Sequence, residues 1–279
     1  MPELKLLFPG GFLDPKISLQ QRPYELDDSV RSRAAIGLVV LATDHVIEHE
    51  FRKILNLPGV GLYQSRILNE PSINAETLSA MESRLEDSVR VILPGMPLDV
   101  IAYGCTSASM VIGPPRVEAL CQNAKPGVRV TNPFTAAVEA LRELDVSRMA
   151  LLTPYRDELN LQMRGLFEKE GIEVPAMASF NVDDDNLVGR ISPDSIKNAV
   201  LEIGDHSAVD AVFVACTNLR IAETIHSLEK QLGKPVTSSN HAMAWHALHL
   251  AGLSHSQKAG GGCSAKRLFF IQISFFRVS

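Results

Sequence analysis

Two short stretches far apart in the chain share one pattern: an aspartate, a run of mostly apolar residues, a cysteine and a threonine. The first starts at Asp99 and reaches Cys105, and the second starts at Asp210 and reaches Cys216 with the same spacing. A thiolate is both a base and a nucleophile. Two thiols that face one small molecule could therefore act on it together, and the repeat predicts Cys105 and Cys216 as that pair.

Two kinds of reaction suit opposing thiols. One thiolate can remove a proton from the carbon beside a carboxylate while the other thiol returns a proton to the opposite face, which is racemisation or epimerisation. Alternatively, one thiolate adds to a double bond and the other cysteine supplies a proton, which gives cis–trans isomerisation. A helix start after each Cys-Thr pair is expected to lower the pKa of these thiols from its ordinary value of roughly 8.5.

The residues that follow each cysteine are small and polar. Thr106, Ser107, Thr217 and Asn218 supply hydroxyl, amide and N–H groups that could hold a carboxylate. Helix capping is their alternative role. The four cysteines of the chain form no C-x-x-C pair, and their spacing matches no zinc site.

The cysteine stretches belong to a chain in which buried strands alternate with helices. Continuous apolar runs typical of buried parallel strands occur at 34–42, 99–104, 148–153 and 210–215. Helical patterns lie between them at 46–55, 74–93, 132–144, 156–170 and 193–203. The order strand, helix, strand, helix, Cys-Thr strand occurs twice. The sequence therefore predicts an α/β protein made of two similar Rossmann-like, flavodoxin-like units with parallel sheets.

The predicted domain boundaries follow from this repeat. We expect an N-terminal arm (1–33), a first α/β domain (34–131 plus 238–258), a second α/β domain (132–237) and an atypical C-terminal tail (259–279). The arm carries several prolines and is compatible with packing on the body or on a second copy of the chain, which leaves a homo-oligomer open. The Gly-rich, then aromatic tail carries no predicted function.

Composition narrows the class of protein. The sequence is 46% hydrophobic and 21% charged, as in ordinary globular enzymes. A net charge of −5 gives no basic field for nucleic acid, although it allows an anionic substrate. No apolar stretch is long enough for a membrane helix, and the N-terminus lacks a signal-peptide layout. We therefore expect a cytoplasmic enzyme with no membrane partner.

Three motifs together carry a resemblance to a known family: Gly-Cys-Thr-Ser at Cys105, Ala-Cys-Thr-Asn-Leu at Cys216, and Leu-Leu-Thr-Pro-Tyr ending at Tyr155. The chain resembles the aspartate/glutamate racemase superfamily over residues 34–252. Within it the sequence looks most like the branch of maleate isomerases and arylmalonate decarboxylases, closest to the ectoine-utilisation proteins. The resemblance implies two domains related by a pseudo-two-fold axis, an active site in the cleft between them, and no cofactor or metal.

The resemblance also implies roles for single residues. Cys105 stands where the isomerases have their nucleophile and Cys216 where they have the proton donor. Tyr155 matches a tyrosine that contacts the substrate carboxylate, and Asn186 matches by spacing a substrate-binding asparagine. Asp44 replaces an asparagine that binds a carboxylate. A negative group there should disfavour a second substrate carboxylate and suit an amine, amide or hydroxyl, which puts maleate itself in doubt.

The sequence thus predicts a cofactor-independent racemase or isomerase that acts on a small carboxylate, either amino-acid-like or a dicarboxylate. A decarboxylase or other lyase or hydrolase that uses one thiol is an alternative, although the decarboxylases of this branch have only one of the two cysteines. A small-molecule-binding or thiol redox protein without turnover is a second alternative.

Overall fold

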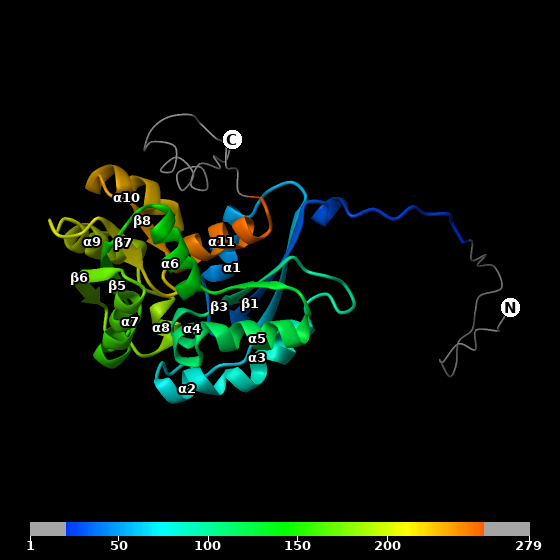
Figure 1. The fold of residues 1–279 in the computed structure, drawn as a ribbon, viewed down its shortest axis with the longest axis horizontal. Coiled ribbons are helices and arrows are strands. Elements are labelled where there is room, and N and C mark those ends of the chain that lie inside the picture. The colour runs from blue at the N-terminus through cyan, green and yellow to red at the C-terminus, as the bar shows by residue number, and fades with distance from the viewer. Residues whose placement is uncertain (1–20, 254–279) are drawn as a thin grey trace.

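Two four-stranded parallel sheets with helices packed on them form the body of the protein (Figure 1). The computed structural model describes residues 21–253. The first 20 residues of the predicted arm and the predicted tail at 259–279 lie outside the described residues. Two similar parallel α/β units were expected from the repeated element order, and the structure confirms this fold class.

The first sheet has the order β2-β1-β3-β4. Its strands are β1 (Ala34–Leu41), β2 (Val60–Ile67), β3 (Val100–Gly104) and β4 (Arg129–Thr131). The helices along this part of the chain are α1 (Ile47–Ile54), α2 (Ala75–Ala80), α3 (Glu82–Arg90), α4 (Thr106–Ile112), α5 (Pro114–Ala124) and α6 (Pro133–Glu143). A short 3₁₀ turn, η1 (Ser29–Arg31), precedes β1.

The second sheet repeats this topology with the order β6-β5-β7-β8. Its strands are β5 (Arg148–Thr153), β6 (Glu173–Ser179), β7 (Ala211–Val214) and β8 (Val236–Ser238). The helices of this part are α7 (Asp157–Lys169), α8 (Asp185–Val188), α9 (Pro193–Gly204), α10 (Ile225–Leu232) and α11 (Ser239–Leu250), with a 3₁₀ turn η2 (Ala222–Thr224) before α10.

In each sheet the chain order reverses between two central strands, β1 and β3 in one and β5 and β7 in the other. Loops that leave the carboxyl ends of such neighbouring strands turn to opposite faces and leave a crevice where α/β proteins bind ligands. Cys105 follows β3 and Cys216 follows β7. The topology thus places each cysteine at the crevice of its own sheet.

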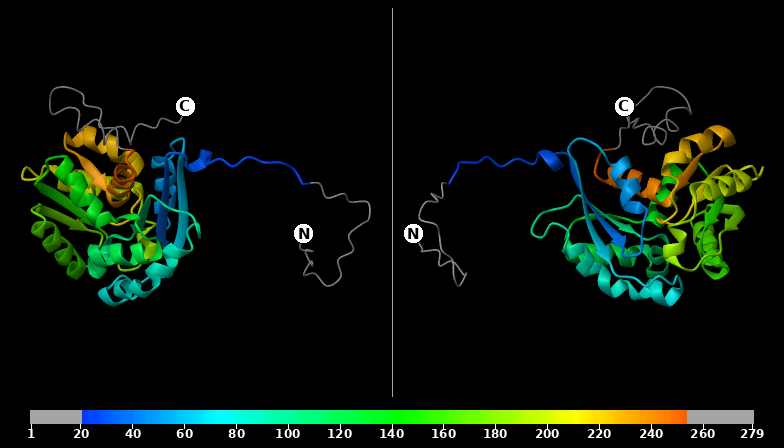
Figure 2. Two further views of the ribbon diagram at one scale, coloured as in Figure 1. Left: turned by 45° about the vertical axis from the view of Figure 1, so that its right-hand side comes forward. Right: turned by 180° about the vertical axis from the view of Figure 1, so that it is seen from behind.

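The last helix, α11, crosses from one half of the molecule to the other. It follows β8 of the second sheet, yet Trp245 and its neighbours pack with Leu38 of β1, Ile47 of α1 and Ala102 of β3 in one apolar cluster. Figure 2 shows α11 in orange beside the blue strands of the first sheet. A larger apolar cluster contains residues of both sheets and joins the two halves.

The two aspartates of the repeated motif lie at the amino ends of their strands, away from the cysteines. Asp99 Oδ2 accepts a hydrogen bond of 2.8 Å from the backbone N–H of Ala35 at the start of β1. Asp210 accepts two hydrogen bonds, of 3.1 and 2.9 Å, from the guanidinium of Arg148 at the start of β5. Each aspartate therefore ties the cysteine strand to the strand beside it, and only the cysteine end of the motif reaches the crevice.

The helices depart from the sequence predictions at two places. The single helix predicted over 74–93 is divided at Met81 into α2 and α3. A helix begins directly after Cys105, as predicted, but the expectation of a helix directly after Cys216 is wrong. Cys216 has a φ of 115°, which a right-handed helix does not allow at that point, and the chain turns before η2 and α10 begin. None of the helices in the described part of the chain is long and apolar enough to cross a membrane.

Gly104, the residue before Cys105, lies where the backbone of β3 meets β1 and α1 most closely. A Cβ atom at this position would be 2.9 Å from the Val39 carbonyl oxygen and 2.7 Å from Ile47 Cδ1. Gly104→Ala is expected to lower the free energy of unfolding by about 1–3 kcal/mol, because a backbone oxygen cannot move aside. Urea unfolding followed by circular dichroism measures the change.

Gly165→Ala in α7 is the matched control, since a Cβ there has nothing within 4 Å. This variant should be unchanged or more stable by about 0.5–1 kcal/mol, as expected for alanine in a helix. Equal stabilities for the two variants would contradict the predicted crowding at Gly104.

Candidate active site

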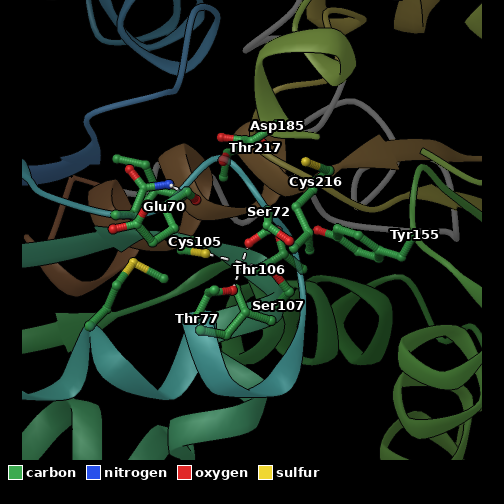
Figure 3. A pocket seen from close by; sticks show the side chains of 15 residues that line it. Glu70, Ser72, Thr77, Cys105, Thr106, Ser107, Tyr155, Asp185, Cys216 and Thr217 are labelled. Atoms are coloured by element: carbon green, nitrogen blue, oxygen red, sulfur yellow. Dashed lines mark hydrogen bonds between the residues drawn. The ribbon is translucent and has the colours of Figure 1, made fainter. Parts of the chain in front are cut away.

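A small, partly enclosed cavity lies between the loops that leave the carboxyl ends of the two sheets (Figure 3). It is lined by 15 residues: Leu41, Asn69, Glu70, Ser72, Ile73, Thr77, Leu78, Met81, Cys105, Thr106, Ser107, Tyr155, Asp185, Cys216 and Thr217. Its volume of about 20 Å³ is close to the minimum for one water molecule. A larger ligand therefore requires the surrounding loops to move apart.

Cys105 is held at the start of α4. Its Sγ accepts a hydrogen bond of 3.4 Å from the N–H of Ala108 and lies 3.8 Å from the hydroxyl of Ser107. Burial nevertheless raises the pKa of Cys105 to about 12, and the negative charges of Asp185 and Asp44 act in the same direction. The Ala108 N–H at the helix start lowers the pKa of Cys105, as predicted, but burial raises that pKa by more.

Cys216 enters the cavity from the second sheet on a strained turn. Its N–H donates to Ser239 Oγ at 3.0 Å, which fixes the left-handed backbone at this residue. Burial raises the pKa of the Cys216 thiol well above its ordinary value, and the charge of Asp185 adds to this. Hydrogen bonds with the Asn218 backbone and the Tyr155 hydroxyl oppose the shift.

The hydroxyl groups of Tyr155 and Ser107 lie near the two thiols. The Tyr155 hydroxyl lies close enough to both Cys216 and Ser107 for these groups to influence its pKa, and the Ser107 hydroxyl lies beside Cys105. Burial raises the pKa of Tyr155 well above its ordinary value, so this group stays a neutral phenol that can donate. Thr106 shares a hydrogen bond of 2.8 Å with Ser239, the residue that also holds Cys216.

Six of the nine predicted site residues line the cavity together: Cys105, Thr106, Ser107, Tyr155, Cys216 and Thr217. The structure places the other three, Asp44, Asn186 and Asn218, behind its wall. Their side chains bond to other protein groups and hold the loops in place.

Asp44 does not line the cavity, in contrast to the sequence prediction. Its Oδ1 accepts from the N–H groups of Val46 and Ile47 at 2.7 and 2.8 Å, which caps the start of α1. Its Oδ2 accepts from the hydroxyl of Thr217 at 2.8 Å. Burial raises the pKa of Asp44 to about 6. Because both oxygens are occupied, the carboxylate connects the two halves of the protein instead of facing the substrate.

Asn218 and Asn186 stabilise the same region from behind. Asn218 Oδ1 accepts from the N–H of His45 at 2.8 Å, and its Nδ2 donates to the Asp185 carbonyl at 2.8 Å. Asn186 Oδ1 lies 3.2 Å from the ring Nε2 of His45. Both asparagines therefore join the loop after β1 to α8 and the loop after β7.

Asp185 is the buried acidic residue among those that line the cavity. It is buried, it accepts a short hydrogen bond from Thr43, and burial raises the pKa of its carboxyl group. Asp185, at the end of the loop after β6, is not among the predicted site residues, and neither are Asn69, Glu70 and Ser72 of the loop after β2. The available signal was topological, since both loops follow the carboxyl ends of outer strands.

These two loops meet across the cavity through backbone hydrogen bonds. The N–H of Ile73 donates to the Asp183 carbonyl at 2.8 Å, and the N–H of Asp185 donates to the Pro71 carbonyl at 2.9 Å. A bridge between Ser72 and Asp184 completes the contact. The contact closes one side of the cavity and accounts for its small volume.

A buried glutamate connects the two halves below the cavity. Glu50 of α1 accepts through Oε1 from the N–H groups of Ile221 and Ala222, each at 2.8 Å, and through Oε2 from Asn240 at 2.8 Å. Asn240 also donates to the carbonyl of Thr217 at 2.8 Å. Burial raises the pKa of Glu50 to about 7. Within the described residues, no cluster of three or more His, Cys, Asp or Glu side chains is arranged to hold a metal ion.

With this geometry in hand, comparison with known proteins identifies the family. A family model described as arylmalonate decarboxylase matches residues 68–263, which is most of the chain. The chain belongs to the arylmalonate decarboxylase family. The maleate isomerase of Nocardia farcinica is 32% identical over 223 residues, which cover 76% of this chain and 88% of that enzyme. The arylmalonate decarboxylase of Bordetella bronchiseptica is 27% identical over 137 residues, 49% of this chain and 57% of that one.

Solved structures of family members share the fold. The maleate cis-trans isomerase of N. farcinica bound to Tris superposes with a TM-score of 0.73 at 30% identity, covering 79% of this chain and 93% of that one. A cysteine-to-serine variant of the same enzyme, with a covalently bound succinylcysteine intermediate, gives a TM-score of 0.73 at 29% identity, covering 79% and 94%. The predicted resemblance to maleate isomerases and arylmalonate decarboxylases is thus confirmed.

Glu50 should make the stability of the protein depend on pH. A carboxyl group whose pKa is higher in the folded state binds its proton more tightly there, so it contributes stability below its ordinary pKa. That contribution is lost as the pH rises through about 7. Between pH 5 and pH 8, wild type should therefore lose on the order of 2 kcal/mol more unfolding free energy than Glu50→Gln.

Urea unfolding at the two pH values measures this difference. In Glu50→Gln the new amide faces Asn240 at both pH values, so any loss of stability from that contact cancels when the two values are compared. Glu48→Gln, a half-exposed position on the same helix, is the control and should change stability by less than about 1 kcal/mol at either pH. A wild type and a Glu50→Gln variant with equal pH dependence would contradict the assigned pKa of Glu50.

Proposed function

We propose that this protein is a cofactor-independent racemase or isomerase of small carboxylates in which Cys105 and Cys216 form the catalytic pair. The observation that supports this most is the shared cavity: one thiol comes from each half of the protein, and both line the same small space. The hydroxyl of Ser107 lies beside Cys105 and that of Tyr155 lies near Cys216, where they can hold the carboxylate of a bound substrate.

For racemisation, the thiolate of one cysteine takes the proton from the carbon next to the carboxylate. An S–H bond forms, the C–H bond breaks, and the electron pair moves into the carboxylate to give an enediolate. Hydrogen bonds from Ser107 and Tyr155 would stabilise the charge on its oxygens. The S–H group of the other cysteine then donates its proton to the opposite face of the carbon. The two cysteines finish with their protonation states exchanged.

For cis–trans isomerisation, the Cys105 thiolate adds to one carbon of a conjugated double bond. A C–S bond forms, and the neighbouring carbon takes the proton of Cys216. Rotation about the resulting single bond is followed by return of a proton to Cys216 and loss of the Cys105 sulfur, which restores the double bond. The succinylcysteine intermediate in the N. farcinica isomerase variant supports this covalent route.

Both routes need one thiolate, although burial raises the pKa of both thiols in the closed cavity. A bound substrate changes this balance, because hydrogen-bond donors or a positive charge beside a thiol lower its pKa. The closed cavity would therefore keep the cysteines protonated and unreactive between turnovers.

Decarboxylation with one thiol is the second candidate, and the match to the arylmalonate decarboxylase family model favours it. It would release CO₂ and protonate the resulting enediolate from one cysteine only. The second thiol in the same cavity has no part in that reaction, so the two-thiol reactions are preferred. The narrower placement among ectoine-utilisation proteins and in the cytoplasm stays a prediction.

Hydrogen exchange into small carboxylates in D₂O, followed by NMR, tests the proposal. Each of the variants Cys105→Ser and Cys216→Ser should lose activity by about 100-fold or more, because each removes an acid–base group. Cys121→Ala is the matched control: Cys121 is a buried free thiol on α5 outside the cavity, so activity should be retained.

The other outcomes distinguish the alternatives. Full activity in Cys216→Ser would exclude the two-thiol mechanism, and CO₂ release from malonates by the same variant would establish decarboxylation. A wild-type protein that binds carboxylates but neither exchanges hydrogen, isomerises nor decarboxylates any of them would be a binding protein.

A further inference from the structure

The charges around the cavity are all of one sign. Among its 15 described lining residues, Asp185 and Glu70 are acidic, and none is Lys, Arg or His. Asp185 is 5% exposed, while Glu70 lies at the exposed rim. A dicarboxylate bound here would place one carboxylate at the hydroxyl groups and the other near Asp185 without a cation. Two carboxylates at close range in a buried site repel each other strongly.

The partners of Asp185 show that it acts as a hydrogen-bond acceptor. Thr43 Oγ1 already accepts a hydrogen bond of 2.8 Å from Asn69 Nδ2, so its single proton is given to Asp185. Asn218 Nδ2 donates to the main-chain carbonyl of Asp185 at 2.8 Å and lies close enough to the side chain to lower the pKa of its carboxyl group. Donors beside Asp185 suit the ionised carboxylate.

Two arginines of this region, Arg66 and Arg156, pair with other groups. Arg66 Nη1 donates to the carbonyls of the loop after β1, and its Nη2 pairs with Glu48 at 3.1 Å. Arg156 pairs with Asp183 at 2.6 Å. His45, whose ring faces Asn186, lowers the pKa of Asp185. A positive group on the ligand would therefore complete the surroundings of Asp185.

We infer that the substrate carries a protonated amino group that binds the Asp185 carboxylate, with its own carboxylate held at Ser107 and Tyr155. This inference rests on the proposed function and narrows it from small carboxylates to amino acids. Figure 3 places Asp185 and Cys216 on the same side of the cavity, with Ser107 and Tyr155 further along it. A carbon that bears both the amino group and the carboxylate would then lie beside the two thiols.

The same contact explains how the thiols could become reactive only when substrate is present. The charge of Asp185 raises the pKa of both Cys105 and Cys216. An ammonium group bound to Asp185 offsets that negative charge beside both sulfurs, which favours the thiolate. The substrate would thus promote its own deprotonation.

Binding of matched ligands tests the inference. Alanine, lactate and methylmalonate share a CH₃–CH–COO⁻ unit whose central carbon carries an ammonium, a hydroxyl or a second carboxylate; 2-aminobutyrate, 2-hydroxybutyrate and ethylmalonate form a second set. Calorimetry on the full chain should give the tightest binding for the ammonium member of each set. Asp185→Asn should weaken that member by about 10- to 100-fold, the value of one charge-assisted hydrogen bond, and should tighten the dicarboxylate.

Two variants serve as controls. Asp184→Asn removes one negative charge from the adjacent position, and its amide oxygen can still accept from the Asn186 N–H as Asp184 does at 2.9 Å, so the wild-type order should persist. Asp185→Glu keeps the charge and should also keep the order. Should Asp185→Asn fail to fold, the wild-type and Asp185→Glu results still decide.

The inference is wrong if wild type binds the dicarboxylate as tightly as the ammonium member, if no ammonium member binds, or if Asp185→Asn leaves the order unchanged. Turnover is measured separately, by hydrogen exchange in D₂O with the same ligands. Ammonium selectivity without any exchange would contradict the proposed function but not the assignment of Asp185. Exchange that depends on both cysteines but favours dicarboxylates would support the proposed function and contradict the assignment of Asp185.

Discussion

The geometry of the site depends on buried polar groups that are satisfied across the two halves of the chain. Asp44 accepts from Thr217, and Glu50 accepts from Ile221 and Ala222, so carboxylates of the first half are paired with donors of the second. A buried carboxylate without such donors would cost several kcal/mol. The two halves therefore have one favourable relative position, which is the position that brings Cys105 and Cys216 to the same cavity.

Much of the fold was predictable because its signals are local. Apolar runs identify β1, β3, β5 and β7, and the repeated Asp-to-Cys spacing identifies the two thiols as equivalent positions. The turn after Cys216 was not predictable, since a polar stretch after a strand is typical of a helix start. The backbone there depends on the bond from Cys216 to Ser239, a residue beyond the next helix.

The identity of the acidic residue in the cavity could not be derived from sequence either. Asp44 and Asp185 both follow strands, and each is a short acidic side chain in a polar loop. What separates them is the set of partners: backbone N–H groups and Thr217 occupy both oxygens of Asp44, whereas Asp185 keeps an edge exposed to the cavity. Thr217 is 173 positions from Asp44, and such a contact leaves no local pattern in the chain.

The backbone contact between the loops at Pro71–Ile73 and Asp183–Asp185 limits how far a change of side chain can disturb the cavity. Its hydrogen bonds use main-chain N–H and C=O groups, so they survive most changes of side chain in either loop. Exposed residues such as Glu70 and Ser72 can therefore be exchanged without losing this backbone contact. The side chains that line the cavity can thus differ while the main-chain contact that joins the two loops stays the same.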